Sequence, residues 1–372
     1  MRELRNPWND YLVHRIYVFT EHGLTPNLVK EFFKETYESG CRYVLDPFVG
    51  SGTVLIEAQR LGIISTGIDV NPWGLLVSRA KTTYPVGIEK FLDTIDFEDS
   101  KVLIPSDRLK EYHTIRVLRA LGKIRSGIEN APEHMKPLLF VIFVKLAESI
   151  SLLRKSPAPR FDSNKRFRDI KAGEVFEEYR NEILKAKEDL DRHRFLAPVY
   201  LIFADSTVWL PDRVCSVLTS PPFANNVDYV RHSQLALLWL GYAKDSQDLG
   251  RLRSMQIPSC EAAARRWRPS LYEDWLLPYL SSIRGSRAHG YRKFLTQYLY
   301  AMKRHFELLK ERLEWEAWYT IGDSILGGAY IPTHEFLRKI AEEVGFKAKL
   351  TVIGQRFRPG RMLYLLRLIN KR

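Results

Sequence analysis

Four residues in the middle of the chain, Ser220-Pro221-Pro222-Phe223, place a hydroxyl, a double proline and an aromatic ring directly after an apolar run. A double proline can neither continue a helix nor donate to a sheet ladder, so the apolar run before it must end here. Each proline ring fixes its φ angle, and the turn therefore presents carbonyl oxygens rigidly. Those carbonyls and the Ser220 hydroxyl can accept hydrogen bonds, while Phe223 offers a ring face for stacking. Taken alone, the tetrapeptide is more typical of a proline-rich turn.

A second segment, DPFVGSGT at 46–53, places two glycines directly before an apolar helical pattern. Gly50 and Gly52 let the backbone turn tightly and approach a ligand. The amides of the following helix favour an anionic or zwitterionic group. The segment is not a phosphate-binding P-loop, because Thr53 stands where the lysine would be, and it does not fit the dinucleotide fingerprint. By itself, such a turn can be merely structural.

Acidic residues end three of the apolar segments that we expect to be strands, at Asp46, Asp69 and Asp205. In this position the Asp69 carboxylate can accept both hydroxyls of a ribose, although it can also cap the helix that begins near Pro72. Asp205 or its neighbouring amides could meet the amino edge of an adenine. Because parallel strands end at the same sheet edge, the three acids together point to one nucleoside-binding site.

The segments around these motifs predict an alternating α/β fold. Residues 26–39 have helical spacing, and Gly40 closes that helix. A strand, the glycine turn, a helix ending at Gly62 and an acid-terminated strand then form the first half of a nucleotide-binding βαβ unit. The last two apolar segments, KLTVIG and MLYLLRLI, are close enough in sequence to pair antiparallel. We expect a mostly parallel sheet with helices on both faces and an antiparallel end.

In their order along the chain, the motifs resemble those of the S-adenosylmethionine-dependent amino-methyltransferases, which modify exocyclic amines of nucleobases. SPPF is similar to their catalytic tetrapeptide, and its serine form resembles cytosine-N4 enzymes more than adenine-N6 enzymes. The resemblance implies a Rossmann-like class I methyltransferase fold with a seven-stranded sheet. It implies direct methyl transfer to a flipped-out base, with catalytic residues Ser220, Pro221, Pro222 and Phe223. No cysteine nucleophile is needed.

The resemblance also assigns the S-adenosylmethionine site. The segment VHRIYVFTEHGLTP before the glycine turn looks like a divergent form of the segment that closes over the methionine end. The resemblance implies these cofactor-binding residues: Thr25, Asp46, Pro47, Phe48, Gly50, Gly52, Thr53, Asp69, Asn71, Asp205 and Ser206. The expected divisions are 1–84, the cofactor-binding N-terminal part of the methyltransferase domain; 85–196, a helical insertion; 197–242, its catalytic strand ends; 243–295, a basic and aromatic insertion; and 296–372, its C-terminal part.

Polar residues directly after the tetrapeptide are candidates for contacts to the substrate. Asn225, Asn226, Asp228 and Tyr229 could read a cytosine edge, or they could hold the kinked loop together. Arg231 could reach a phosphate or lie solvated on a helix. His14, His22 and His232 are more typical of ordinary polar positions. In the insertion, the arginines assigned to nucleic acid are Arg265, Arg266 and Arg268.

The two insertions concentrate positive charge. Between 251 and 293, nine basic residues face three acids and alternate with Trp267, Tyr272, Trp275, Tyr279 and Tyr291. This mixture suits backbone contacts and base stacking, although a solvated surface with buried aromatics gives the same pattern. The loop 154–171 adds seven basic residues against two acids.

The whole chain of 372 residues carries a formal charge of +13 and has a pI near 9.5, so it should attract polyanions. A charge-rich surface without such a partner is the alternative. The most apolar stretch, 138–153, is too short and too charged for a membrane span. The three separated cysteines argue against disulfides and a metal site, and together with the absence of an apolar signal core they favour the cytoplasm.

Nucleic acid is therefore the expected partner, and RNA is favoured over DNA. No zinc finger or clear helix-turn-helix pattern is present, and arginines with aromatics suit an unpaired base in folded RNA. The layout also resembles archaeal proteins that dimethylate a cytosine amine in small-subunit ribosomal RNA. The alternatives are a DNA cytosine-N4 or, less favoured, adenine-N6 methyltransferase, and a non-catalytic RNA-binding module, against which the intact motifs argue.

Overall fold

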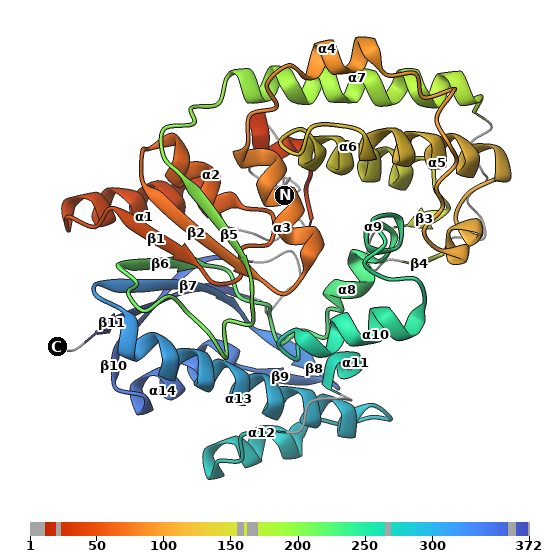
Figure 1. The fold of residues 1–372 in the computed structure, drawn as a ribbon. Helices are drawn as coiled ribbons and strands as arrows, with labels where there is room; N and C mark the ends of the chain where they lie inside the picture. The colour runs from red at the N-terminus through yellow and green to blue at the C-terminus, as the bar shows by residue number, and fades with distance from the viewer. Residues whose placement is uncertain are drawn as a thin grey trace.

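A twisted seven-stranded sheet forms the centre of the molecule (Figure 1). The computed structural model describes residues 12–19, 24–154, 160–161, 170–264, 269–355 and 362–370. Within these ranges the strand order is β10-β11-β7-β6-β1-β2-β5. The five strands from β7 to β5 run parallel, and β11 runs antiparallel to both of its neighbours. The strands are β1 (Tyr43–Asp46), β2 (Ile64–Asp69), β5 (Val199–Phe203), β6 (Ser216–Thr219), β7 (Glu316–Gly322), β10 (Phe346–Gln355) and β11 (Met362–Asn370).

This topology confirms the α/β fold class, the mostly parallel sheet and the antiparallel closing pair. The reversed strand, β11, lies one position inside the edge. The chain forms the edge strand β10 first and then reverses direction, so that β11 lies between β10 and β7. The chain runs from β1 outward to β5 and then returns to place β6 on the other side of β1. The strand order therefore reverses between β1 and β6, which is where open α/β sheets bind ligands.

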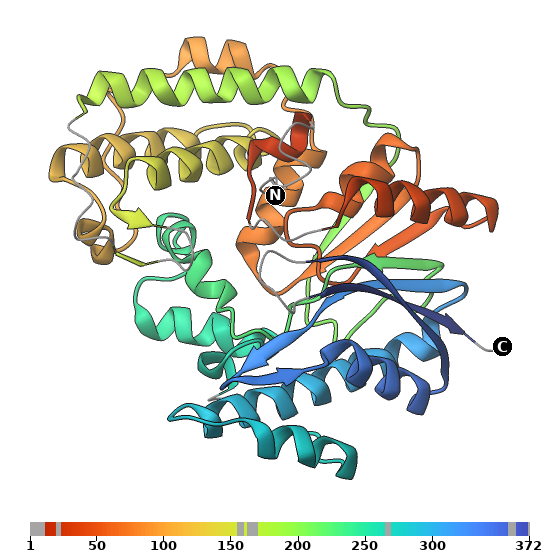
Figure 2. The same ribbon diagram turned by 180° about the vertical axis from the view of Figure 1, so that it is seen from behind.

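Helices cover both faces of the sheet, as Figures 1 and 2 show from opposite sides. Helices α1, α2 and α3 lie on one face, and α13 and α14 lie on the other. Gly40 follows α1 at φ +83°, as the sequence predicts, and Thr25 caps the start of this helix. These helices are α1 (Pro26–Glu38), α2 (Thr53–Arg60), α3 (Pro72–Thr82), α13 (Ala288–Arg312) and α14 (Thr333–Glu343).

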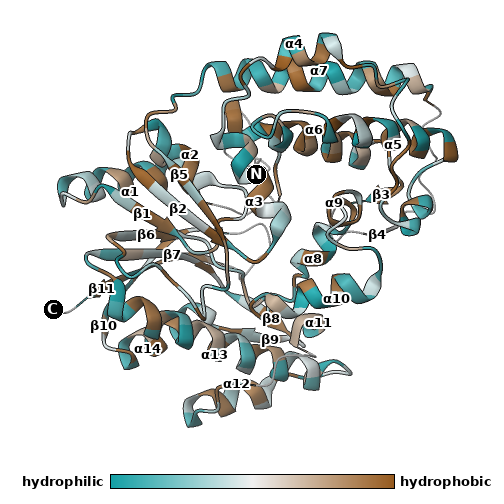
Figure 3. Ribbon diagram, in the orientation of Figure 1, coloured by the Kyte–Doolittle hydropathy of each residue, from teal (hydrophilic) through white to brown (hydrophobic). Residues whose placement is uncertain are grey.

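The segment 85–196 is helical, as expected, and forms a layer beyond α3. Figure 3 shows hydrophobic residues along α6, which packs against α3, α5 and α7 in one continuous core. The short N-terminal helix η1 (Leu12–Ile16) joins this core through Val13 and Ile16. The elements of the layer are α4 (Ile88–Thr94), η2 (Asp107–Glu111), α5 (Ile115–Glu129), α6 (Lys136–Ser149), β3 (Leu153–Arg154), β4 (Arg160–Phe161) and α7 (Ala172–Asp191).

The basic and aromatic segment 243–295, which the sequence suggests to be irregular, contains several helices. Most of it is helical, and α13 already begins at Ala288, before the expected start at 296. The sequence pattern hides this start because residues 288–293 are mostly polar or small and only half-buried, which leaves no clear apolar stripe. The remaining elements are α8 (Tyr229–His232), α9 (Gln234–Trp239), α10 (Ser246–Met255), α11 (Glu261–Ala264), η3 (Asp274–Leu276), α12 (Leu277–Ser282) and the hairpin β8 (Ser324–Leu326) and β9 (Ala329–Ile331).

The expectation that no disulfide forms is wrong for Cys41 and Cys215, which are joined in the structure. They lie 174 residues apart in sequence but directly precede the adjacent parallel strands β1 and β6, and their Cα atoms are 6.0 Å apart. Sheet pairing therefore brought together two cysteines whose spacing gave no signal. Cys260 is buried and free.

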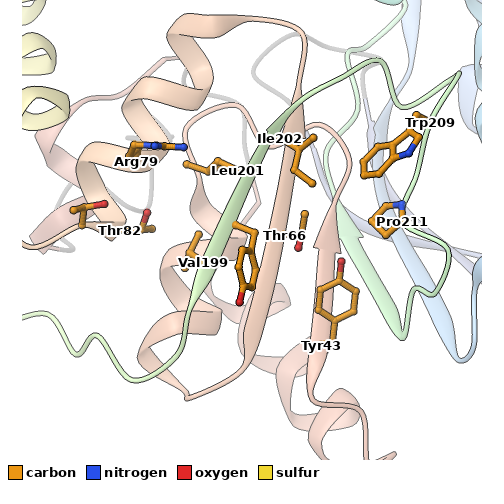
Figure 4. A pocket seen from close by; sticks show the side chains of 11 residues that line it. Tyr43, Thr66, Arg79, Thr82, Val199, Leu201, Ile202, Trp209 and Pro211 are labelled. Carbon is orange, nitrogen blue, oxygen red and sulfur yellow. The ribbon is translucent and has the colours of Figure 1, made fainter. Parts of the chain in front are cut away.

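A pocket of about 540 Å³ opens on the sheet near the edge strand β5 (Figure 4). Tyr43, Thr66 and Ile202 line it from the strands, and Trp209 and Pro211 line it from the segment after β5. Its lining includes none of the residues that the sequence assigns to a site, so we do not identify it with the candidate active site. No helix among the described residues is long and apolar enough to cross a membrane.

Candidate active site at the carboxyl edge of the sheet

The carboxyl ends of β1 and β6 are joined by a buried hydrogen bond. The Thr219 hydroxyl donates to Asp46 Oδ1 at 2.6 Å, and the Phe48 amide donates to the same oxygen at 3.1 Å. Asp46 is 3% exposed, and burial raises the pKa of its carboxyl to about 7. Asp46 therefore fixes the glycine turn to the strand that carries the tetrapeptide. Sequence reasoning did not single out Thr219.

The glycine turn is tied to the end of β2 through Asp69. The Gly50 amide donates to Asp69 Oδ2 at 3.0 Å, and the Asn71 amide donates to Oδ1 at 2.8 Å. Burial is the main cause that raises the pKa of Asp69 to about 6. Both oxygens keep a further lone pair, so this partly exposed carboxylate can still accept ligand hydroxyls. Asp69 thus serves the turn and remains available to a ribose.

Glycine is required at position 52 for two reasons. Its φ is +81°, and a Cβ there would lie 2.8 Å from Ser78 Oγ. Pro47 and Gly52 are buried, whereas Thr53, the first residue of α2, is half-buried. No side chain caps α2, so its first amides face the turn without an intrahelical acceptor. The turn and α2 therefore provide donors where a ligand with an anionic or zwitterionic end would lie.

The end of β5 offers a third contact. Asp205 Oδ1 accepts from the Thr207 amide and hydroxyl, each at 2.8 Å, while Oδ2 has no hydrogen-bond partner in the described part of the chain. Phe48, half-buried, presents a ring nearby on the glycine turn. Two carboxylates, one aromatic ring and the α2 amides fit a nucleoside with a zwitterionic tail, as S-adenosylmethionine is.

His305 of α13 contacts both the segment after β5 and the glycine turn. Its Nδ1 donates to the Ser206 carbonyl at 2.9 Å, so Nε2 of the neutral ring accepts from the Tyr319 hydroxyl at 2.7 Å. Burial lowers the pKa of His305 to about 4, which keeps the ring neutral. The ring also contacts Phe48, with centroids 5.1 Å apart. Sequence reasoning missed His305, because a single histidine in a helix gives no signal.

The N-terminal segment lies against this region through buried polar contacts. His14 pairs with Glu57 of α2 at 3.1 Å, and Tyr17 donates to Glu148 of α6 at 2.9 Å. Lys81 Nζ donates to the Tyr17 carbonyl at 2.6 Å and to the Ser51 carbonyl at 3.3 Å. This lysine, also missed from sequence, is buried, which lowers its pKa to about 7.

Part of the segment expected to close over the methionine end, residues 20–23 with His22, lies outside the described residues. Thr25, assigned to the cofactor, accepts from the Leu28 amide at 3.4 Å and caps α1. Asn71 likewise has a local role, because its Oδ1 accepts from the Trp73 amide and its Nδ2 donates to Ser233. These two residues therefore position the turns around the site.

The tetrapeptide follows β6 directly, beside Asp46. Ser220 and Pro222 are half-buried, and the carbonyls of Ser220, Pro221 and Pro222 accept no hydrogen bond from the described residues. The Ser220 hydroxyl has no partner there either. Phe223 is 6% exposed, so its ring face is largely covered in this structure and is not open for stacking.

Most polar residues after the tetrapeptide hold the loop. Asn226, at φ +61°, accepts from the Glu261 amide at 3.1 Å. Asp228 caps α8 through Oδ1 and pairs with Arg253 through Oδ2 at 2.8 Å. The Tyr229 hydroxyl accepts from the Phe223 amide at 3.5 Å. Asn225 differs from all of these, because its buried Oδ1 has no hydrogen-bond partner among the residues that the structure describes.

Only some of the basic residues that are expected to contact nucleic acid lie in the described part of the chain. Arg265, Arg266 and Arg268 lie outside the described residues, as does most of 154–171. Arg231 is exposed on α8. The aromatics divide: Tyr272 is exposed, whereas Trp275 and Tyr279 pack on Phe336 at centroid distances of 5.2 and 4.8 Å. Trp275 and Tyr279 are therefore half-buried against the core rather than fully open for base stacking.

No cluster of metal-binding side chains occurs in the described ranges, and a comparison with known protein-family models finds no match. The chain is similar to several methyltransferases. The type II methyltransferase M.MvaI of Kocuria varians is 25% identical over 269 residues, which cover 63% of this chain and 59% of that protein. M.MjaII of Methanocaldococcus jannaschii is 29% identical over 152 residues, 37% of this chain and 28% of that protein.

A longer similarity extends to M.AvaI of Nostoc sp., at 24% identity over 386 aligned residues that cover 89% of this chain and 77% of that protein. The chain spans less than two thirds of the length of M.MvaI and M.MjaII. Together with the sheet topology, these similarities support a Rossmann-like methyltransferase fold, and they agree with S-adenosylmethionine as the cofactor.

Proposed function

We propose that this protein transfers a methyl group from S-adenosylmethionine to the exocyclic N4 amine of cytosine in DNA. The observation that carries the proposal is the tetrapeptide with its unoccupied carbonyl acceptors, held beside the glycine turn by the bond between Asp46 and Thr219. The proposal is supported by the position of the tetrapeptide and of Asp46 at the point where the strand order reverses.

The chemistry required of the protein is mainly positioning. S-adenosylmethionine supplies an electrophilic methyl group when it is bound. The amine of cytosine is a poor nucleophile because its lone pair is delocalised into the ring. Carbonyl oxygens of the prolyl turn and the Ser220 hydroxyl accept the amine hydrogens and favour a pyramidal nitrogen whose lone pair faces the methyl group. With the cofactor bound, the nitrogen–carbon bond would form as the methyl–sulfur bond breaks and S-adenosylhomocysteine leaves, and the amine would lose one proton to solvent.

DNA replaces RNA as the proposed polymer. The arginine and aromatic pattern favours RNA, but two of its aromatics, Trp275 and Tyr279, are half-buried against the core and pack on Phe336. The relatives are named type II methyltransferases, the term used for DNA-modifying enzymes, and this supports the alternative. The serine of SPPF supports cytosine N4 over adenine N6, through its resemblance to cytosine-N4 enzymes.

Nucleoside mass spectrometry of DNA and RNA from cells with and without the gene tests the proposal. We expect N4-methyldeoxycytidine to disappear from DNA when the gene is absent. Loss of methylated cytidine from RNA alone would restore the RNA hypothesis, and loss of N6-methyldeoxyadenosine would move the target to adenine. The purified chain with labelled S-adenosylmethionine should reproduce the same product on DNA from the deletion strain.

A further inference from the structure

Asn225 is the one residue of the loop 225–229 with an amide that the described fold leaves unused. Its Oδ1 is buried from solvent and has no hydrogen-bond partner, and no described residue bonds to its Nδ2.

The surrounding loop holds Asn225 in place. Its own amide donates to the Phe223 carbonyl at 2.8 Å, which binds it to the last residue of the tetrapeptide. On its other side, Asn226 is fixed by Glu261, and Asp228 is fixed by Arg253. The side chains of Asn226 and Asp228 thus have structural partners, whereas the side chain of Asn225 between them and the tetrapeptide has none among the described residues.

A buried amide without a partner destabilises the folded protein, and a ligand that donates a hydrogen bond to it recovers that loss. The ligand must supply a donor to Oδ1. The exocyclic amine of cytosine is such a donor, and ring atom N3 beside it is an acceptor that an Asn Nδ2 can satisfy. The second amine hydrogen then remains for the prolyl carbonyls.

We propose that Asn225 binds the amine edge of the target base, with Oδ1 accepting an amine hydrogen and Nδ2 donating to the adjacent ring nitrogen. This inference rests on the proposed function. It assigns to Asn225 the selection of an amine-bearing base, and it leaves to Asn226, Asp228 and Tyr229 the construction of the loop.

The test compares Asn225→Leu, which removes the polar atoms at similar volume, with Asn226→Ala, which removes a structural acceptor. In the free protein we expect Asn225→Leu to leave the melting temperature unchanged or raised, because no bond is lost. Asn226→Ala should lower it. On DNA, Asn225→Leu should reduce kcat/KM about tenfold or more while S-adenosylmethionine affinity is retained.

A binding measurement separates this inference from the proposed function. Fluorescence anisotropy with short single-stranded oligodeoxycytidylate and oligothymidylate should show a preference for deoxycytidylate that Asn225→Leu abolishes. An unchanged preference, or kcat/KM within about twofold of the wild-type value, would overturn the role of Asn225. If the preference is lost in the variant but the wild-type protein methylates neither DNA nor RNA, the proposed function fails and the amine contact stands.

Discussion

The two sides of the sheet edge differ in how their polar atoms are used. On the side of β1, β2 and β5, Asp46 and Asp69 are each held by two hydrogen bonds from within the protein. On the side of β6, the backbone carbonyls of residues 220–222 and the side-chain amide of Asn225 have no partner among the described residues. Asp46 and Asp69 are thus bonded within the protein, whereas the carbonyls after β6 offer acceptors that a substrate can use.

This difference matches the tasks that we propose. A cofactor that is the same in every turnover can be bound by turns that are rigid before it arrives, which lowers the ordering cost of binding. An amine that must be pyramidalised needs acceptors that become satisfied as the reaction proceeds. Changes to Asp46 and Asp69 should therefore alter stability and cofactor affinity. Changes to the tetrapeptide 220–223 should alter turnover.

Asp46→Asn should give the largest effect, on the pH dependence of stability. The folded pKa of about 7 lies above the unfolded value of 3.8, so the contribution of Asp46 is fully present at low pH and is lost as the pH rises towards 7. Asparagine keeps an acceptor for Thr219 and does not ionise. Denaturant unfolding should therefore show the variant gaining on the wild-type protein between pH 4 and pH 8, by a few kcal/mol at most. A constant difference would show that Asp46 does not titrate in this range.

Asp69→Ala should weaken S-adenosylmethionine binding by about a hundredfold, because it removes a carboxylate acceptor and releases the Gly50 amide from its place. Isothermal titration calorimetry measures the change. Asp69→Asn is the matched control, since it retains one oxygen and should lose less affinity. Equal affinity in the alanine variant would mean that Asp69 only builds the turn.

The sequence predicted the strand ends well because their signals are local. Asp69 at the end of β2, Gly50 and Gly52 at the turn and the prolines after β6 follow from backbone requirements that neighbouring residues reveal. The helices at 26–39 and around 53–62 were predicted for the same reason. The motif order then gave the fold class.

Contacts that arise only when distant strands meet could not be predicted. Thr219 meets Asp46 across 173 residues, and His305 meets Ser206 across 99. The bond between Cys41 and Cys215 depends on β1 and β6 being neighbours. The hairpin of β8 and β9 was missed because its strands have three residues each, too few to show alternation.

Pro221→Ala should lower kcat on DNA by about tenfold and leave S-adenosylmethionine affinity unchanged. Alanine keeps the carbonyl but frees φ, so the acceptors are no longer held in one orientation. Single-turnover methylation measures the rate of the chemical step. Pro211→Ala, in the segment after β5, is the control for general loss of a proline. An unchanged single-turnover rate would refute the role of the prolyl turn.

The smallest effect concerns the ion pair that closes the loop after the tetrapeptide. Arg253 Nε lies 2.8 Å from Asp228 Oδ2, and both side chains are largely buried. Arg253→Met keeps most of the packing and removes the charge, which should cost about 1 kcal/mol of stability. Because Asp228 still caps α8, we expect KM for DNA to rise only about twofold, with S-adenosylmethionine affinity retained. A large loss of cofactor affinity would show that the two sides of the edge are coupled through this loop, contrary to the division proposed here.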